Sequence, residues 1–145
     1  MIIIVNLIFL SIIFYNLNKR KQNMYNARVE RISILATSFL LALGLIFNWS
    51  FDGEMLGYVT ALNASLSFFS YLSSAGITSD NFNCRMDTSI FIISIPFDRI
   101  DGIRIIENHD KIQVKIKAHS SEYYQEYKLE AKEYIETLAK GLGPF

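Results

Sequence analysis

The chain has few of the residues that metal sites and most active sites require. Its 145 residues include one cysteine, two histidines and two prolines. A single cysteine, Cys84, cannot form an intrachain disulfide, and His109 and His119 show no metal-ligand spacing of the CxxC or HExxH type. We therefore expect no structural metal and no cofactor.

Charge is also scarce in the first half of the chain. Between Met1 and Gly76 the charged side chains are confined to two short stretches, which leaves three long apolar runs without an ionisable residue. Proton relays, ion-coupled transport and intramembrane hydrolysis generally need an ionisable side chain inside a span. We therefore expect neither transport nor intramembrane catalysis from this chain alone.

The three apolar runs predict transmembrane helices at about 1–17, 32–51 and 55–75. Runs of this length, at 1.5 Å rise per residue, approach the hydrocarbon thickness of about 30 Å. Serine, threonine and asparagine dilute the third run, but it carries no charge. The short acidic turn Asp52-Gly53-Glu54 before it favours a helical hairpin, because exposed irregular backbone is not tolerated in lipid.

The basic residues predict the orientation of these helices. A secretory signal peptide would carry positive charge before its apolar stretch, whereas here the charge follows the first run. Basic flanks are retained in the cytoplasm, so we expect a multi-pass cell-membrane protein with its N-terminus outside and its C-terminal part in the cytoplasm. The basic residues of the first loop are Lys19, Arg20, Lys21, Arg28 and Arg31.

Small and amide side chains indicate contacts between helices. Gly57, Ala61 and Ser65 recur every four residues and predict a face that another backbone can approach closely. That face either packs against the first two helices or forms a homo-oligomer or partner-subunit contact. The uncharged amides of the apolar runs are expected to hydrogen-bond between helices; they are Asn6, Asn48 and Asn63.

After Gly76 the pattern changes to strand-like alternation. Residues 111–118 alternate apolar and polar side chains most clearly, residues 103–105 precede them in a hairpin, and residues 122–129 alternate again. Residues 77–86 and 89–95 supply two further expected strands. From Glu130 the apolar residues recur at helical spacing until Gly141 and Gly143. We expect a soluble α+β domain at 77–145, an antiparallel meander of about five strands with one C-terminal helix.

One stretch supports a family resemblance. Transmembrane helices, a glycine, strands containing Ile95-Pro96-Phe97-Asp98-Arg99-Ile100-Asp101-Gly102-Ile103, a hairpin and a final helix follow one another. This layout resembles the small uncharacterised bacterial membrane proteins that carry a pleckstrin-homology-like cytoplasmic domain. Those proteins often have Trp where this chain has Phe97, and the expected domain is a strand or two short of theirs. The resemblance implies a PH-like module that binds lipid or protein, and it transfers no catalytic residue.

The remaining candidates are basic. Arg104, Lys115 and Lys117 can form a stripe that contacts anionic lipid or a partner, or they can simply keep a sheet face soluble. The same lipid or partner contact is the alternative role for the five basic residues of the first loop, whose charge the topology already explains. The acids around Arg99 show no sign of a pocket or of an altered pKa, so we expect no catalytic residue.

The sequence thus predicts a membrane-anchored, non-catalytic interaction module that is not an enzyme. Its partners are the lipid bilayer and a protein or a second copy of the chain, without nucleic acid, because no basic footprint is present. The module is expected to bind a partner protein or the inner-leaflet surface. The alternative is an accessory or immunity-type subunit that docks through Gly57, Ala61 and Ser65 onto a larger membrane complex.

Overall fold

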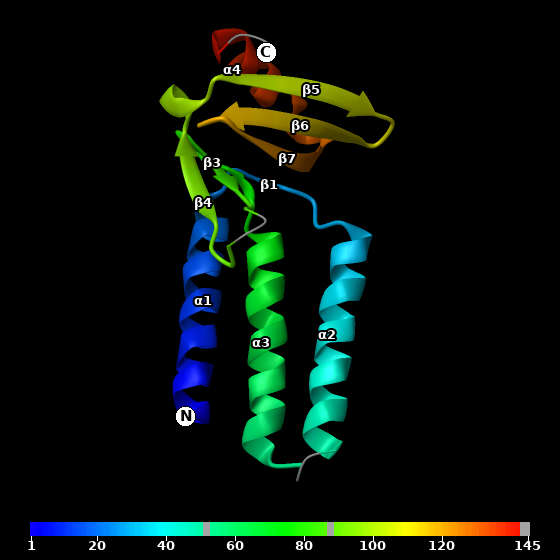
Figure 1. The fold of residues 1–145 in the computed structure, drawn as a ribbon. Coiled ribbons are helices and arrows are strands. Elements are labelled where there is room, and N and C mark those ends of the chain that lie inside the picture. The colour runs from blue at the N-terminus through cyan, green and yellow to red at the C-terminus, as the bar shows by residue number, and fades with distance from the viewer. Residues whose placement is uncertain (51–52, 87–88, 143–145) are drawn as a thin grey trace.

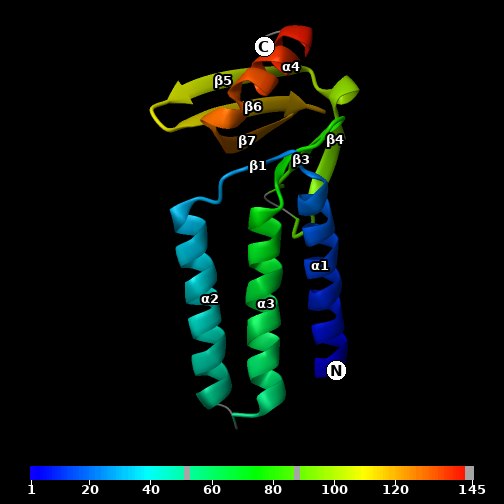
Figure 2. The ribbon, with the colours of Figure 1, turned by 180° about the vertical axis from the view of Figure 1, so that it is seen from behind.

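The computed structural model describes residues 1–50, 53–86 and 89–142. Three long helices lie side by side, and antiparallel sheets with a C-terminal helix sit across one end of them (Figure 1). The N-terminus lies at the opposite end of the helices from the sheets (Figure 2). The helical first half and the sheet-rich second half agree with the sequence expectation.

The three helices are α1 (Ile2–Gln22), α2 (Arg31–Ser50) and α3 (Met55–Ser73). Two of them, α1 and α2, are long and apolar enough to cross a membrane. The basic residues 19–21 belong to the last turn of α1 rather than to a loop. Cations in the last turn of a helix face the negative end of the helix dipole. Phe51 and Asp52, which we assigned to the second run and the acidic turn, lie outside the described residues.

Helix α3 lies between α1 and α2 and packs against both (Figure 1). Asn6 forms two hydrogen bonds between α1 and α3. Its Nδ2 donates to Thr60 Oγ1 at 2.7 Å, and its Oδ1 accepts from Asn63 Nδ2 at 2.7 Å. The expected interhelical role is therefore confirmed for Asn6 and Asn63. Asn48 instead donates to the carbonyl of Glu54 at the α2–α3 turn, at 3.1 Å.

A four-stranded antiparallel sheet covers the ends of the helices. Its order is β1-β2-β3-β4, and the strands are β1 (Tyr25–Asn26), β2 (Gly76–Ile77), β3 (Asn81–Cys84) and β4 (Ile93–Pro96). Strand β1 comes from the connection between α1 and α2. The approach of β1 to β2 requires Gly76, because a Cβ there would lie 2.5 Å from the Tyr25 carbonyl oxygen.

The second sheet is a three-stranded meander of β5 (Gly102–Asn108), β6 (Lys111–Ala118) and β7 (Ser121–Lys128). A short 3-10 helix η1 (Phe97–Arg99) leads into it, and η2 (Leu129–Ala131) with α4 (Lys132–Leu142) follows it. The apolar residues of β6 point inward and are buried together with Phe82, Tyr127 and Ile135 in one core. The inward alternation predicted for β6 is confirmed.

The antiparallel strands and the C-terminal helix agree with the prediction, but the described residues form seven strands in two sheets rather than one meander of about five. Residues 77–86 form a hairpin rather than one strand, since the Thr78 hydroxyl accepts from the Asn81 N–H and closes a tight turn. Only the end of 89–95 is a strand, and β1 adds a pairing from outside the expected domain. Helix α4 also continues through Gly141, while Gly143 lies outside the described residues.

Candidate functional site

The connection between α1 and α2 is built into both sheets. Beyond the β1–β2 pairing, Ala27 N–H donates to the Ala75 carbonyl at 2.9 Å in the first sheet. The next residue, Arg28, donates its N–H to the Glu126 carbonyl of β7 at 2.6 Å. The segment thus lies between the two sheets and ties them to the helix ends.

A buried polar network also joins helices to sheets. Asn83 of β3 donates through Nδ2 to Asn23 Oδ1 at 2.6 Å, and its Oδ1 accepts from Ser94 Oγ at 2.6 Å. Its carbonyl accepts from Gln125 Nε2 at 2.9 Å. Lys19 Nζ extends the network by donating to Ser94 Oγ at 2.9 Å. A lysine expected to contact lipid or a partner is therefore engaged inside the protein.

The β3–β4 connection is held against the helices. Tyr71 OH donates to the Met86 carbonyl at 2.6 Å, and Tyr15 OH donates to the Ile92 carbonyl at 3.2 Å. The buried Asn16 side chain donates to the Ile90 carbonyl and accepts from the Ile92 N–H. These contacts fix Met86, Ile90 and Ile92 next to the ends of α1 and α3.

A cleft of about 920 Å³ opens between this segment, the end of α3 and the start of β7. Helix α3 supplies apolar and aromatic lining, whereas β7 and the β3–β4 connection supply apolar or aromatic as well as polar side chains, and Glu30 precedes α2. The lining residues are Glu30, Phe68, Tyr71, Leu72, Arg85, Met86, Ser89, Ile90, Ser121, Glu122, Tyr123 and Tyr124. The cleft thus needs both halves of the chain.

The charged side chains of the cleft differ in their partners. Glu122 forms an ion pair with Lys115 at 2.7 Å and accepts from Tyr124 OH at 3.0 Å. The hydrogen bond from Lys115, assisted by that from Tyr124, lowers the pKa of Glu122. Within residues 1–50, 53–86 and 89–142, neither Glu30 nor Arg85 forms an ion pair. Among the described lining residues, the carboxylate of Glu30 and the guanidinium of Arg85 are therefore the charged groups without an ion-pair partner.

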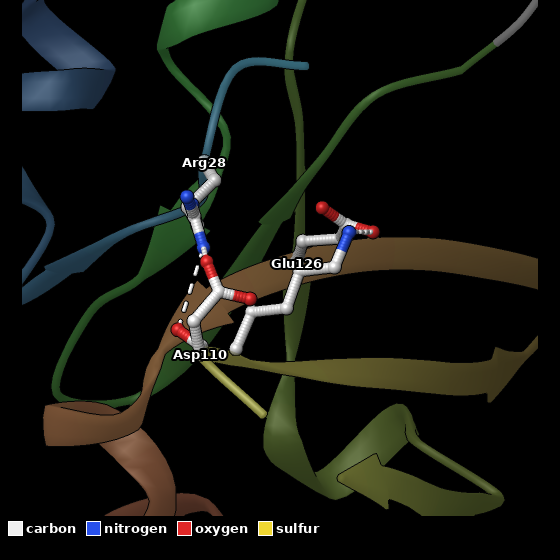
Figure 3. A network of polar contacts seen from close by, with 4 residues as sticks. Arg28, Asp110 and Glu126 are labelled. Atoms are coloured by element: carbon white, nitrogen blue, oxygen red, sulfur yellow. Dashed lines mark hydrogen bonds and ion pairs between the residues drawn. The ribbon is translucent and has the colours of Figure 1, made fainter. Parts of the chain in front are cut away.

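A smaller hollow of about 340 Å³ lies at the other end of β7. Arg28 contacts Asp110 there at 2.9 Å (Figure 3). Lys111 contacts Glu126 at 2.6 Å. The hydrogen bond from Arg28 lowers the pKa of the Asp110 carboxyl. Arg28 thus links the α1–α2 connection to the β5–β6 hairpin.

The structure divides the predicted basic residues into two groups. Arg20, Lys21 and Arg31 are exposed near the ends of α1 and α2. Arg104 and Lys115 are paired neighbours on one face of the second sheet, and Lys117 follows two residues along the same face. Because Lys115 is paired with Glu122 and lies 5.3 Å from the Tyr124 ring centroid, the predicted stripe is partly neutralised.

The small-residue face of α3 packs within the chain. A Cβ at Gly57 would overlap the Asn48 side chain, and one at Gly44 of α2 would lie 2.8 Å from the Ala61 Cβ. Ser65 is buried and donates to the Ala61 carbonyl at 2.9 Å. Helix α2 thus covers Gly57 and Ala61, which the accessory-subunit alternative would need exposed.

The described residues show little reactive chemistry. Burial raises the pKa of the Cys84 thiol to about 12, which disfavours its nucleophilic thiolate. No group of three or more His, Cys, Asp or Glu side chains within the described ranges could hold a metal ion. The acids flanking Arg99 are exposed around η1.

Sequence reasoning missed the cleft and its polar residues, Glu30, Arg85 and Glu122. These residue types show no recognisable spacing in the sequence. The alternation at 122–129 predicts that Tyr123 and Tyr124 belong to a strand, and it gives no sign that they line a cleft. Comparison of the chain with protein-family models, curated proteins and solved structures finds no match.

Proposed function

We propose that the chain is a membrane-anchored, non-catalytic interaction module that binds a partner protein in the cleft between α3 and β7. The observation that carries this proposal is the composition of the cleft, in which apolar and aromatic walls surround a few polar groups. Such a lining is typical of binding sites. The buried Asn16 side chain holds the Ile90 carbonyl, and Gln125 of β7 donates to the Asn83 carbonyl, so that a partner meets a preformed surface.

The proposal includes three transmembrane helices, with α3 as the third. The serines that lower the hydropathy of α3 support this reading, because Ser65, Ser67 and Ser70 are buried within the protein and donate to carbonyls of their own helix. Polar side chains satisfied in this way are compatible with a span. In contrast, Leu62, Leu66 and Phe69 of α3 are exposed.

The proposed orientation places the sheets in the cytoplasm and the N-terminus outside. The end of α1, the start of α2 and the end of α3 all adjoin the sheets (Figure 1). The basic residues of the α1 end and of the α1–α2 connection therefore share one side, as the positive-inside rule expects of a cytoplasmic face. Trp49 of α2 and Tyr58 of α3 lie near the helix ends that are remote from the sheets.

A PH-like domain is also part of the proposal. Strand β1, contributed from between two helices, supplies a pairing that residues 77–145 lack alone. Two antiparallel sheets followed by a C-terminal helix support the layout implied by the resemblance. In this interpretation the α2–α3 hairpin is an insertion between the first two strands of the domain.

Cysteine labelling tests the orientation. Glu54→Cys and His109→Cys place single exposed thiols at the two ends of the molecule, and the buried Cys84 can remain. In intact cells a membrane-impermeant maleimide should label Glu54→Cys but not His109→Cys, and permeabilised cells should show both labelled. The unsubstituted chain should stay unlabelled. Labelling of His109→Cys in intact cells would reverse the orientation.

Photo-crosslinking tests the cleft. A photoreactive amino acid replaces Tyr124 in the cleft or, as the matched control, Ile106 on the same sheet; their exposed fractions are 55% and 48%. The proposal expects a discrete protein adduct at position 124 and none at 106. Lipid adducts alone at 124 would favour binding to the inner leaflet instead. Equal adducts at both positions would remove the cleft from the proposal.

A further inference from the structure

Strand β7 is an edge strand whose outward main chain is only partly used. The sheet order is β5-β6-β7, so within the described part of the chain one side of β7 has no strand beside it. An edge strand presents main-chain N–H and C=O groups that can pair with another chain. At Glu126 this edge is already occupied, because the Arg28 N–H donates to its carbonyl.

The β6–β7 hairpin determines which other main-chain groups face outward. Ala118 pairs with Ser121 across the two residues His119 and Ser120, both of which have positive φ, as type I′ turns require. The pair flanking a two-residue turn is hydrogen-bonded, and hydrogen-bonded pairs then alternate with non-hydrogen-bonded ones. Glu122, Tyr124 and Glu126 therefore direct their main-chain groups away from β6. The bond to the Glu126 carbonyl agrees with this assignment.

The outward groups of Glu122 and Tyr124 lie at the cleft. Both residues line it, and no hydrogen bond from the described parts of the chain reaches their outward N–H or C=O groups. The uncovered stretch is 121–124, which extends over roughly 13 Å at about 3.3 Å per residue. The cleft thus has room beside an edge strand that lacks a pairing partner there.

We propose that the cleft binds an extended segment of a partner protein, which pairs antiparallel with the β7 edge at Glu122 and Tyr124 and carries alternating basic and apolar side chains. This inference rests on the proposed function and names how the partner is recognised. Main-chain pairing at a sheet edge supplies affinity, and the neighbouring side-chain surfaces supply specificity.

The two faces of β7 specify the alternation. Glu122 and Tyr124 lie on the outer face, where the carboxylate and the aromatic ring already hold one basic side chain, that of Lys115. Glu30 lines the same cleft and forms no ion pair within the described ranges, so it is the carboxylate that a basic side chain of the added strand would neutralise. Tyr123 lies on the inner face, which continues to Phe68 and Leu72 of α3. An apolar side chain suits that face.

The inference is tested with the full chain in detergent micelles and a labelled probe, acetyl-Lys-Val-Lys-Val-Lys-amide. Two control peptides have the same sequence as the probe. One carries N-methyl groups on the main-chain nitrogens of the lysines, and the other carries them on those of the valines. In antiparallel pairing the residues opposite Glu122 and Tyr124 are the ones that exchange main-chain bonds with β7. Methylation of the lysines should therefore weaken binding by about tenfold or more, whereas methylation of the valines should leave it nearly unchanged.

Other outcomes overturn the inference. If both methylated peptides lose affinity equally, or if neither loses any, main-chain pairing is excluded. If a Glu-Val-Glu-Val-Glu peptide binds as tightly as the lysine probe, the requirement for basic side chains is excluded. Crosslinking of a protein at position 124 would still support the proposed function in those cases, so the two failures are distinguishable. Absence of probe binding together with absence of a protein adduct would overturn both.

A variant of the protein gives an independent test. Tyr124→Pro removes an outward N–H from the edge, a position at which proline is tolerated. It should weaken probe binding by about tenfold or more, whereas Glu107→Pro on β5, at the opposite edge, should not. Resistance of Cys84 to alkylation reports that each variant is folded. A folded Tyr124→Pro variant that binds the probe normally would overturn the inference.

Discussion

The two halves of the molecule place their apolar side chains in opposite ways. Helix α2 has no buried residue, and its Phe47 and Trp49 are 67% and 79% exposed. Strand β6 buries four side chains completely, at Ile112, Val114, Ile116 and Ala118. In water the first pattern is unfavourable by roughly 25 cal/mol for each Å² of exposed apolar surface, while the second is that of an ordinary core. The contrast is the one expected if, as proposed, the helices lie in lipid and the sheets lie in water.

The halves also use polar side chains differently. In α3, serines donate to carbonyls of their own helix, which needs no other element. Between the sheets and the helices, Asn83 joins segments that are distant in sequence. Loss of one such buried partner leaves other groups unsatisfied. The junction is therefore the part of the molecule where the two halves depend on each other.

The largest effect that sharpens this contrast is expected in the core. Ile116→Ala should lower the free energy of unfolding of the sheets by about 2 to 5 kcal/mol, because it leaves a cavity at a fully buried position. Leu35→Ala on α2, where the side chain is 68% exposed, should change it by about 0.5 kcal/mol or less. Alkylation of Cys84 in denaturant measures both. Equal losses would contradict the distinction.

A charge in the middle of α2 has the next largest expected effect. Leu40→Lys should make membrane integration of α2 less favourable by about 2.5 to 3.5 kcal/mol if this face contacts lipid. Ile106→Lys on the second sheet is the control, because its side chain is already 48% exposed. The integrated fraction after alkaline extraction measures the difference. Full integration of Leu40→Lys would break the comparison by placing α2 in a polar environment.

The sequence predicts the parts of the fold that local patterns determine. The alternation along β6 and β7, and the apolar runs of α1 and α2, depend on neighbouring residues alone. Strand β1 has two residues, and its pairing with Gly76 depends on an approach between distant segments, so no period in the sequence reveals it. The prediction therefore lacked the strand that the α1–α2 connection contributes.

The cleft, like strand β1, depends on contacts between segments that are distant in the sequence. Phe68 of α3 and Tyr124 of β7 both line it, and only the tertiary arrangement brings them together. One relevant signal was present, since a two-residue turn at His119 and Ser120 fixes which main-chain groups of β7 face outward. The pair lacks the Asn-Gly pattern that usually marks such turns, and the turn was not recognised.

The smallest expected effect concerns the ion pair that links the two halves. Arg28 lowers the pKa of Asp110 from its ordinary value of 3.8, so the ionised carboxylate stabilises the folded state. This contribution is fully present above about pH 3.8 and is lost as the pH falls through the lowered pKa. Asp110→Asn should therefore lower the thermal midpoint slightly at pH 6 and not at all at strongly acidic pH. The effect is small because exposed ion pairs contribute little.

Near-UV circular dichroism of the tyrosines measures this midpoint without relying on thiol chemistry, which itself changes with pH. An Arg28→Met background provides the control, because Asp110→Asn should have no effect there if the two side chains act as a pair. A difference that persists in that background would assign the stabilisation by Asp110 to Lys111 or to its own main chain, the other groups that lower its pKa. In that case the hairpin would stabilise itself, and the link from Arg28 to the second sheet would reduce to the main-chain bond to Glu126.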